Sequence, residues 1–509
     1  EARDRAALVD DVAYRVHLDL DRGAETFGCE TEISFTARQD GTTFVDCTAA
    51  RVHEVELDGQ PLDLAQVSET RLHLPSLTAG AHRLRVVADM AYQHEGKGLH
   101  RFVDPTDDRV YLHSQFEPFD AHLVYPCFDQ PDLRATFELT VDAPREWVVV
   151  SNSRPVEQPD EGAAGRWRFA PTPRIPTYIT AVVAGSYTSV HDHHDGIDLG
   201  LYVRRSLAEH LDPDEIFEVT KQGLDFFQRV FDQPYPFGDT YDQLFVPEFS
   251  AGAMENPGCI TFTEAYVFRS KVTDAIRERR AETILHEMAH MWFGDLVTMR
   301  WWDDLWLNES FATFMAVLAQ AEATRWTDAW TTFLDAEKAW AKYQDQLPST
   351  HPVADRMPDV ESVHQNFDGI TYAKGASVLR QLVAWVGQDA FLAGCRDYFA
   401  RHAWSNTELS DFLEALERAS GRELGSWRDE WLLTTGINRL RLEAEIDQGR
   451  LDEVAIVQDS PTPDWADLEG VDVGPQPLRR HRVTVGVYED TDAGLVRTRH
   501  VELDVSGER

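Results

Sequence analysis

Hydrophobic positions in the first 187 residues follow the short alternating pattern that is typical of β-strands. Each apolar or alternating run is bounded by turn residues and is shorter than an ordinary helix. The runs span residues 14–20, 31–37, 81–90, 109–115, 135–141, 147–151 and 178–185. The pattern predicts a β-rich N-terminal domain over residues 1–187, built as a curved sheet or a sandwich.

The pattern changes near residue 188, where the periodicity of helices begins to appear. Helical spacing over residues 213–231 stops before Pro234 and Pro236, and residues 240–246 and 260–268 again have strand character. From residue 274 to residue 431 helical patterns dominate. We therefore expect an α/β domain over residues 188–436.

The last part of the chain returns to β character. Strand-like runs cover residues 440–446, 453–457, 482–488 and 496–505. They predict a small β-sandwich over residues 437–509, and the whole chain is expected to be a multidomain α+β protein. A chain of 509 residues is long enough for several domains with extensive cores.

The net charge of the chain limits the classes of binding partner that are expected. The chain has 48 Lys plus Arg against 88 Asp plus Glu, a formal charge of −40. Such a surface repels phosphate backbones and anionic membranes, so neither nucleic acid nor a membrane is an expected partner. No run approaches the roughly 20 apolar residues of a membrane-spanning helix. Cationic ligands are favoured instead.

The number and spacing of the cysteines indicate the kind of cellular compartment in which the protein works. The five cysteines are widely spaced and form no CxxC pair, which argues against a disulfide framework and favours a reducing compartment. We expect a cytoplasmic protein. Because the chain begins at Glu1 without a methionine, a removed leader and a trimmed chain both stay open as alternatives.

The strongest chemical signal is HEMAH, an HExxH motif in the helical run 276–293. Positions i and i+4 share one helix face, so His286 and His290 can reach one metal ion with Glu287 beside it. The alternative is a pair of surface histidines without a ligand. A second helical run, residues 305–319, favours the metal site because Glu309 follows His290 after eighteen residues, the spacing of a third zinc ligand. Two histidines and one carboxylate are typical of a catalytic zinc ion.

Upstream lies GAMEN, residues 252–256, which follows a predicted strand. GAMEN, HEMAH and Glu309 within LWLNESFA together resemble the zinc aminopeptidase family of aminopeptidase N type, in particular its long actinobacterial form. The stretch from Gln115 to Pro118 and the stretch YPCFD (residues 125–129) are similar to motifs of the family's first domain. The resemblance covers essentially the whole chain, and it implies that the α/β domain has a thermolysin-like fold.

The resemblance also implies roles for single residues. One zinc ion per chain would be held by His286, His290 and Glu309, with Glu287 as the general base. Tyr372 in YAKG resembles the family's catalytic tyrosine, which donates a hydrogen bond to the oxyanion. Without the resemblance, Tyr372 would be interpreted as a core tyrosine.

An aminopeptidase must also bind the free ammonium group of its substrate. By resemblance, Glu255 would fill this role together with Glu117 and Gln115, and Glu309 would lie close enough to contribute. The backbone of Gly252, Ala253 and Met254 would pair with an extended substrate as an added strand. Ala251 is small, which leaves space for a large first side chain and is compatible with broad specificity.

The sequence departs from the family pattern in three places. Gln130 replaces the Glu that is common after the YPCFD stretch, and Pro257 follows Asn256. The resemblance further implies a large helical domain after the small β module, whereas this sequence ends at Arg509. It is therefore expected to be either a fragment or a short natural form.

The sequence predicts a monomeric zinc aminopeptidase that acts on peptides with a free N-terminus. Three alternatives stay open: a thermolysin-like endopeptidase, an epoxide hydrolase similar to leukotriene hydrolase, and a scaffold without catalysis. The complete set of catalytic and metal-binding residues argues against the scaffold. Cleavage of substrates with a blocked amine would favour the endopeptidase.

Overall fold

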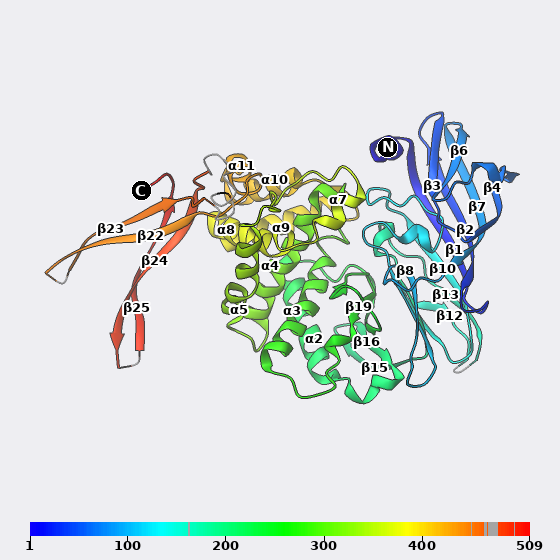
Figure 1. Ribbon diagram of the computed structural model, residues 1–509, viewed down its shortest axis with the longest axis horizontal. Coiled ribbons are helices and arrows are strands. Elements are labelled where there is room, and N and C mark those ends of the chain that lie inside the picture. The colour runs from blue at the N-terminus through cyan, green and yellow to red at the C-terminus, as the bar shows by residue number, and fades with distance from the viewer. Residues whose placement is uncertain (161–162, 449, 463–465, 467–476, 493) are drawn as a thin grey trace. The chain divides into compact units, whose positions relative to one another are not determined.

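The computed structural model describes residues 1–509 apart from residues 161–162, 449, 463–465, 467–476 and 493. The chain divides into two compact units. The first comprises Glu1–Trp301 and His402–Asn406, and the second comprises Trp302–Arg401 and Thr407–Arg509. Figure 1 shows the elements of both units by label and colour.

The first unit begins with a short helix, α1 (Ala2–Leu8), and an eight-stranded sheet in the order β12-β13-β10-β1-β2-β7-β4-β5. Its strands are β1 (Val9–Asp19), β2 (Thr26–Ala37), β4 (Arg51–Leu57), β5 (Gln60–Pro61), β7 (Gly80–Ala91), β10 (Thr136–Ala143), β12 (Pro155–Glu157) and β13 (Gly165–Phe169). β1 pairs antiparallel with β2 and parallel with β10. Burial alternates along β7, which explains why its apolar positions could be identified from the sequence.

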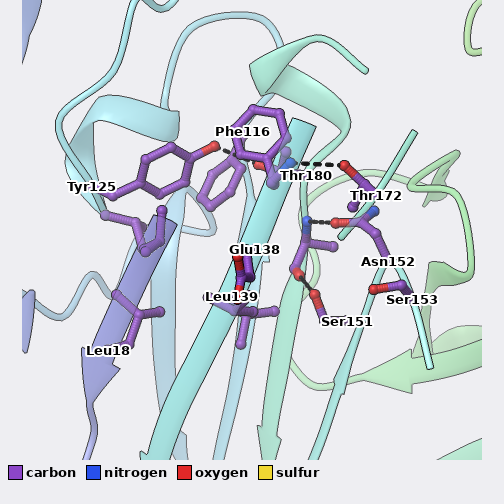
Figure 2. A pocket seen from close by; sticks show the side chains of 15 residues that line it. Leu18, Phe116, Tyr125, Glu138, Leu139, Ser151, Asn152, Ser153, Thr172 and Thr180 are labelled. Carbon is purple, nitrogen blue, oxygen red and sulfur yellow. Dashed lines mark hydrogen bonds between the residues drawn. The ribbon is translucent and has the colours of Figure 1, made fainter. Parts of the chain in front are cut away.

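A four-stranded sheet in the order β11-β14-β9-β8 accompanies the larger one. Its strands are β8 (Gly98–Val103), β9 (Val110–Gln115), β11 (Val148–Ser151) and β14 (Val182–Gly185), while β3 (Gly41–Asp46) and β6 (Arg71–Leu77) form a separate pair. Residues of the eight-stranded and four-stranded sheets line an interior cavity of about 30 Å³ (Figure 2). The Tyr125 hydroxyl and the Thr180 Oγ1 are hydrogen-bonded beside it at 2.7 Å. This cavity is too small for a peptide substrate.

The rest of the first unit has an α/β arrangement. A five-stranded sheet runs in the order β15-β16-β17-β19-β18, with β15 (Tyr187–His194), β16 (Ile197–Arg204), β17 (Thr240–Val246), β18 (Ala253–Met254) and β19 (Cys259–Thr263). The helices α2 (Pro213–Phe231) and α3 (Asp274–His290) pack on this sheet, α2 against β15 and α3 against β18 (Figure 1). The short strand β20 (Thr298–Met299) follows α3.

The second unit is mainly helical. Its helices are α4 (Leu305–Ala323), α5 (Ala329–Asp335), α6 (Glu337–Gln344), α7 (Val360–Gln365), the π-helix η7 (Ile370–Lys374), α8 (Gly375–Val386), α9 (Gln388–His402), α10 (Leu409–Ser420) and α11 (Gly425–Trp431), with β21 (Asn406–Thr407) before α10. Every residue of α4 from Leu305 to Gln320 is buried, so α4 is the central helix of this unit.

The C-terminal part of the second unit forms two hairpins (Figure 1). β22 (Arg439–Asp447) pairs antiparallel with β23 (Arg450–Asp459), and β24 (His481–Thr491) pairs antiparallel with β25 (Gly494–Val505). They are two separate two-stranded sheets.

The predicted fold class is confirmed: a β-rich N-terminal part, an α/β and helical catalytic region, and C-terminal strands. The bounds predicted for residues 213–231 and 240–246 coincide with α2 and β17. The prediction missed β15 and β16, and it extended the strand at residue 260 over a 3-10 turn at Glu264–Tyr266. The division at residues 187 and 436 stays a prediction. Within the described residues, no helix has the length and apolar character needed to cross a bilayer.

Candidate metal centre and peptide-binding residues

The last turn of α3 presents the HExxH side chains. The Nε2 atoms of His286 and His290 lie 3.1 Å apart, and the two rings are inclined by 74°. The Nδ1 atom of His290 lies 3.2 Å from the carbonyl oxygen of Phe293, which can only accept a hydrogen bond. Nδ1 therefore holds the proton, and the Nε2 lone pair points toward His286. This geometry fits two imidazoles that bind one metal ion.

Close packing on α2 fixes the position of α3. A Cβ added at Gly223 of α2 would lie 2.6 Å from the Cδ2 atom of Leu285 and 2.8 Å from the Sδ atom of Met288. A larger residue at position 223 would therefore require the Leu285 and Met288 side chains to shift. Trp292, just after α3, packs against Phe227 and Phe231 of α2. The last turn of α3 is thus held by a tightly packed helix pair.

Glu255 lies beside the HExxH side chains in the first unit. One ligand atom from each of Glu255, Glu287 and His290 lies within 4.8 Å of the other two, and all three residues are buried. Two carboxylates and an imidazole therefore lie close together, and the negative charge of the carboxylates favours the binding of a cationic group.

The GAMEN loop brings Glu255 to this position through β18. β18 is an edge strand, and among the described residues it pairs with β19 alone, through Ala253 with Phe262 and Met254 with Thr261. An edge strand offers unpaired backbone groups to an extended peptide. The backbone next to Glu255 can therefore align a substrate.

Gln115 and Glu117, which are predicted to help bind the substrate ammonium group, lie at the end of β9 and just after it. The Nε2 atom of Gln115, at the end of β9, lies 3.4 Å from the Sδ atom of Met254. Burial, followed by the negative charges of Glu255, Asp295 and Glu117, raises the pKa of Tyr178 well above its usual value. Gln115 and Glu117 thus lie around the same acidic region as Glu255.

The second unit contains Glu309 and Tyr372. Glu309 is buried on α4, and Tyr372 is half-buried on η7. The Ser310 hydroxyl donates a 2.6 Å hydrogen bond to the carbonyl oxygen of Thr371, so the turns that present Glu309 and Tyr372 are tied together. π-Helical turns are frequent at functional sites. No pattern in the sequence indicated this turn.

Comparison with known proteins identifies the family. The model of the peptidase family M1 domain matches residues 215–431, and the model of the peptidase M1 N-terminal domain matches residues 11–179. The chain belongs to the peptidase M1 family.

Relatives in this family include Aminopeptidase N of Streptomyces lividans. It is 54% identical to this chain over 520 residues, an alignment that covers 100% of this chain and 60% of that protein. Aminopeptidase M1 of Arabidopsis thaliana is 34% identical over 71% of this chain and 40% of its own length. Tricorn protease-interacting factor F2 of Thermoplasma volcanium is 33% identical over 69% of this chain and 44% of its own length. The chain thus spans 60% of the first relative and less than half of the other two.

Asn152 holds the GAMEN loop in place, and the sequence analysis missed it. Its Nδ2 atom donates to the carbonyl oxygens of Pro257 at 3.0 Å and Ile179 at 2.9 Å, while its Oδ1 accepts from the Ala181 backbone at 2.7 Å. Gly258, with φ +70°, approaches so closely that an added Cβ would lie 2.7 Å from the Asn152 carbonyl oxygen. Asn152 lies between two serines after β11, so its sequence context indicated only a turn.

Arg134 is a second buried residue that the sequence analysis missed. Its guanidinium donates to the carbonyl oxygens of Asp295, Leu296, Ser405 and Arg174. Burial lowers its pKa to about 10, so it remains charged at neutral pH. The buried Asp295 has its pKa raised well above the usual value, by burial first and then by the charge of Glu255. Arg134 therefore connects the N-terminal sheet to the segment that follows α3.

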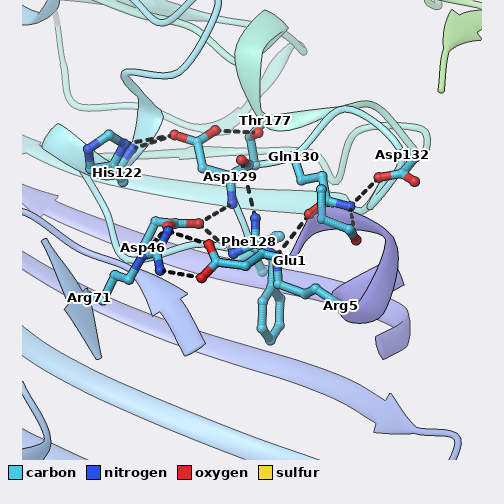
Figure 3. Close-up of polar contacts among 12 residues, drawn as sticks. Glu1, Arg5, Asp46, Arg71, His122, Phe128, Asp129, Gln130, Asp132 and Thr177 are labelled. Atoms are coloured by element: carbon cyan, nitrogen blue, oxygen red, sulfur yellow. Dashed lines mark hydrogen bonds and ion pairs between the residues drawn. The ribbon is translucent and has the colours of Figure 1, made fainter. Parts of the chain in front are cut away.

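The departure from the M1 pattern at Gln130 has a structural explanation (Figure 3). The Gln130 amide donates to the carbonyl oxygen of Ala2 at 2.9 Å and to Asp132 at 2.6 Å, and its oxygen accepts from Arg5 at 2.9 Å. Arg5 also pairs with the buried Asp46 at 2.6 Å. A glutamate could not make the two donor contacts, and it would add a carboxylate next to Asp132. Gln130 thus anchors α1 to the N-terminal sheets.

Proposed function

We propose that the protein is a zinc-dependent aminopeptidase that hydrolyses the first peptide bond of peptides with a free N-terminus. The observation that supports it most is the meeting of Glu255, Glu287 and His290 within 4.8 Å. In a peptide, the terminal nitrogen and the first carbonyl carbon are only about 2.5 Å apart. An ammonium group bound at Glu255 therefore brings the first peptide bond, rather than a later one, to Glu287.

His286, His290 and Glu309 would hold the zinc ion. The support comes from the facing Nε2 atoms, the fixed tautomer of His290, the spacing to Glu309 and membership of the M1 family. A bound zinc ion supplies a Lewis acid and makes water available as a nucleophile near neutral pH.

Glu287 would act as the general base. It takes a proton from the attacking water and later passes it to the leaving amine. Its position next to His290 and Glu255 in the buried cluster supports this role. Burial excludes competing water and strengthens these electrostatic interactions.

Tyr372 would stabilise the oxyanion by donating a hydrogen bond from its hydroxyl group. The support is its resemblance to the family's catalytic tyrosine and its place on η7, which the Ser310–Thr371 hydrogen bond ties to the helix of Glu309.

Substrate binding would use Glu255, Glu117 and Gln115 for the ammonium group and the edge of β18 for the backbone. Gly252, Ala253 and Met254 would pair with the peptide as an added strand, supported by the free edge of β18. The acidic surroundings that raise the pKa of Tyr178 favour a cation at this end.

A cytoplasmic monomer is the proposed working form. All five cysteines are free and buried, which fits a reducing compartment. Burial raises the pKa of Cys29 and Cys47 to about 12, so both thiols stay protonated and unreactive.

Hydrolysis of alanine and leucine arylamides by the 509-residue chain tests the proposal, together with N-acetylated versions of the same substrates. We expect chelator-sensitive release that zinc restores, and no release from the acetylated substrates. Equal cleavage of both forms would favour an endopeptidase. Absence of release from a zinc-loaded protein would contradict the proposal for this chain.

A further inference from the structure

A cavity of about 390 Å³ lies in the second unit, and the described residues that line it include none of the side chains proposed above for peptide hydrolysis. Its walls come from α6, the end of η7, α8, the segment after α11 and the start of β24. This volume lies in the range of sites that bind small molecules.

The cavity is strongly cationic in a chain of formal charge −40. Lys338, Lys342, Lys374 and Arg479 line it, whereas Asp345 is its only carboxylate among the described residues. His481 also lines the cavity, but its pKa is lowered to about 4, by burial first, so it is neutral at pH 7. The lining therefore has a net charge of about +3 when the other groups are ionised.

The lysines of the chain are concentrated at this cavity. The sequence has six lysines in all, at positions 97, 221, 271, 338, 342 and 374, because most of its basic residues are arginines. Three of the six line this one cavity. Lysine and arginine are the side chains that bind oxyanions best.

Most of this positive charge has no acidic partner. Asp345 pairs with Lys374 at 2.9 Å. In the part of the chain that the structure describes, no carboxylate lies within ion-pair distance of Lys338, Lys342 or Arg479. Arg479 donates instead to neutral acceptors such as Thr434 Oγ1, at 2.7 Å, and the Thr435 carbonyl oxygen, at 2.8 Å.

Folding thus brings like charges together at a free-energy cost. Burial, followed by the positive charges of Lys342 and Arg380, lowers the pKa of Lys338. Burial also lowers the pKa of Lys374, although Asp345 opposes this effect. An anion with more than one negative charge would offset this repulsion.

We propose that this cavity is a binding site for a small oxyanion with at least two negative charges, of the phosphate or polycarboxylate class. Lys338 and Lys342 approach it from one face of α6, at positions i and i+4, and Arg479 approaches from the segment before β24. We expect neutral solutes and monovalent anions to bind more weakly, because they offset none or only part of the positive charge of the lining.

Titration calorimetry and thermal unfolding of the full 509-residue chain test the proposal, with inorganic phosphate and citrate as separate probes. Ionic strength is kept constant with sodium chloride, because the acidic surface makes every charge effect sensitive to salt. We expect saturable binding of one anion per chain and a rise in Tm for at least one probe. The probe that binds more tightly distinguishes a phosphate site from a polycarboxylate site.

Lys338→Gln and Lys342→Gln are the informative variants, because Lys338 is half-buried and Lys342 is exposed, and each substitution removes one positive charge from the lining. Each is expected to weaken binding about tenfold, since one charged hydrogen bond is lost. Lys271→Gln is the matched control: it makes the same charge change at an exposed position outside the cavity. Binding of neither probe, or equal weakening by Lys271→Gln, would overturn the proposal. The test does not require peptidase activity.

Discussion

The Nε2 atoms of His286 and His290 face each other at 3.1 Å on the last turn of α3. The carbonyl oxygen of Phe293 orients His290 from the other side of the ring. Helix geometry puts both rings on one face of α3, and the backbone contact orients the ring of His290.

This geometry predicts separate effects for the three HExxH residues. His286→Ala or His290→Ala should lose most bound zinc, because two ligands cannot replace three. Glu287→Gln should keep zinc and lower kcat by about 10²-fold to 10⁴-fold, because only the proton acceptor is removed. Metal analysis combined with arylamide hydrolysis separates these effects. His191→Ala, at an exposed position on β15, is the control. Loss of zinc from Glu287→Gln would argue against its role as a base.

Tyr372→Phe should lower kcat by about 10²-fold to 10³-fold with little change in KM, because an oxyanion contact exists only in the transition state. Zinc content should stay unchanged. The half-buried ring packs near Phe367, with centroids 6.4 Å apart, and phenylalanine preserves that contact. A rise in KM at constant kcat would show that Tyr372 binds the ground state instead.

Gly258→Ala should destabilise the GAMEN loop by about 2 kcal/mol or more. The residue has φ +70°, and the new Cβ would collide with the Asn152 backbone. Gly252→Ala in the same loop is the control for stability, because an added Cβ there has no atom within 4 Å. Urea unfolding measures both variants. Equal stability of the two would mean that the loop relaxes without strain.

Arg5→Met should cost about 3 kcal/mol of unfolding free energy at pH 8, because it removes the close cationic partner of the buried Asp46 carboxylate and leaves the more distant Arg71, at 3.9 Å. Burial raises the folded-state pKa of Asp46, and Arg5 opposes that shift, so removing Arg5 raises this pKa further. A raised folded-state pKa stabilises below the unfolded pKa and loses that contribution as the pH rises. The loss caused by Arg5→Met should therefore be smaller at pH 5 than at pH 8.

Arg3→Met on the same helix is the control for this experiment, because Arg3 is exposed. Its unfolding free energy should match that of the unchanged protein at both pH values. An Arg5→Met loss that does not depend on pH would indicate lost packing rather than an uncompensated charge.

The sequence by itself determined the features that depend on local spacing. The i and i+4 positions of His286 and His290 need only a helix, and the bounds of α2 and β17 follow from the periodicity of their own residues. The family motifs added expectations for Glu255, Glu309 and Tyr372, because their spacing along the chain is itself the signal.

Only the tertiary structure decided which distant residues meet. Gln115 contacts Met254 across 139 positions, and Asn152 holds Pro257 across 105. No local pattern encodes such contacts, because they arise when separate sheets and loops bury common surfaces. The same holds for the cationic cavity: Lys338, Lys374 and Arg479 are ordinary charged residues along the sequence, and folding alone places their like charges together.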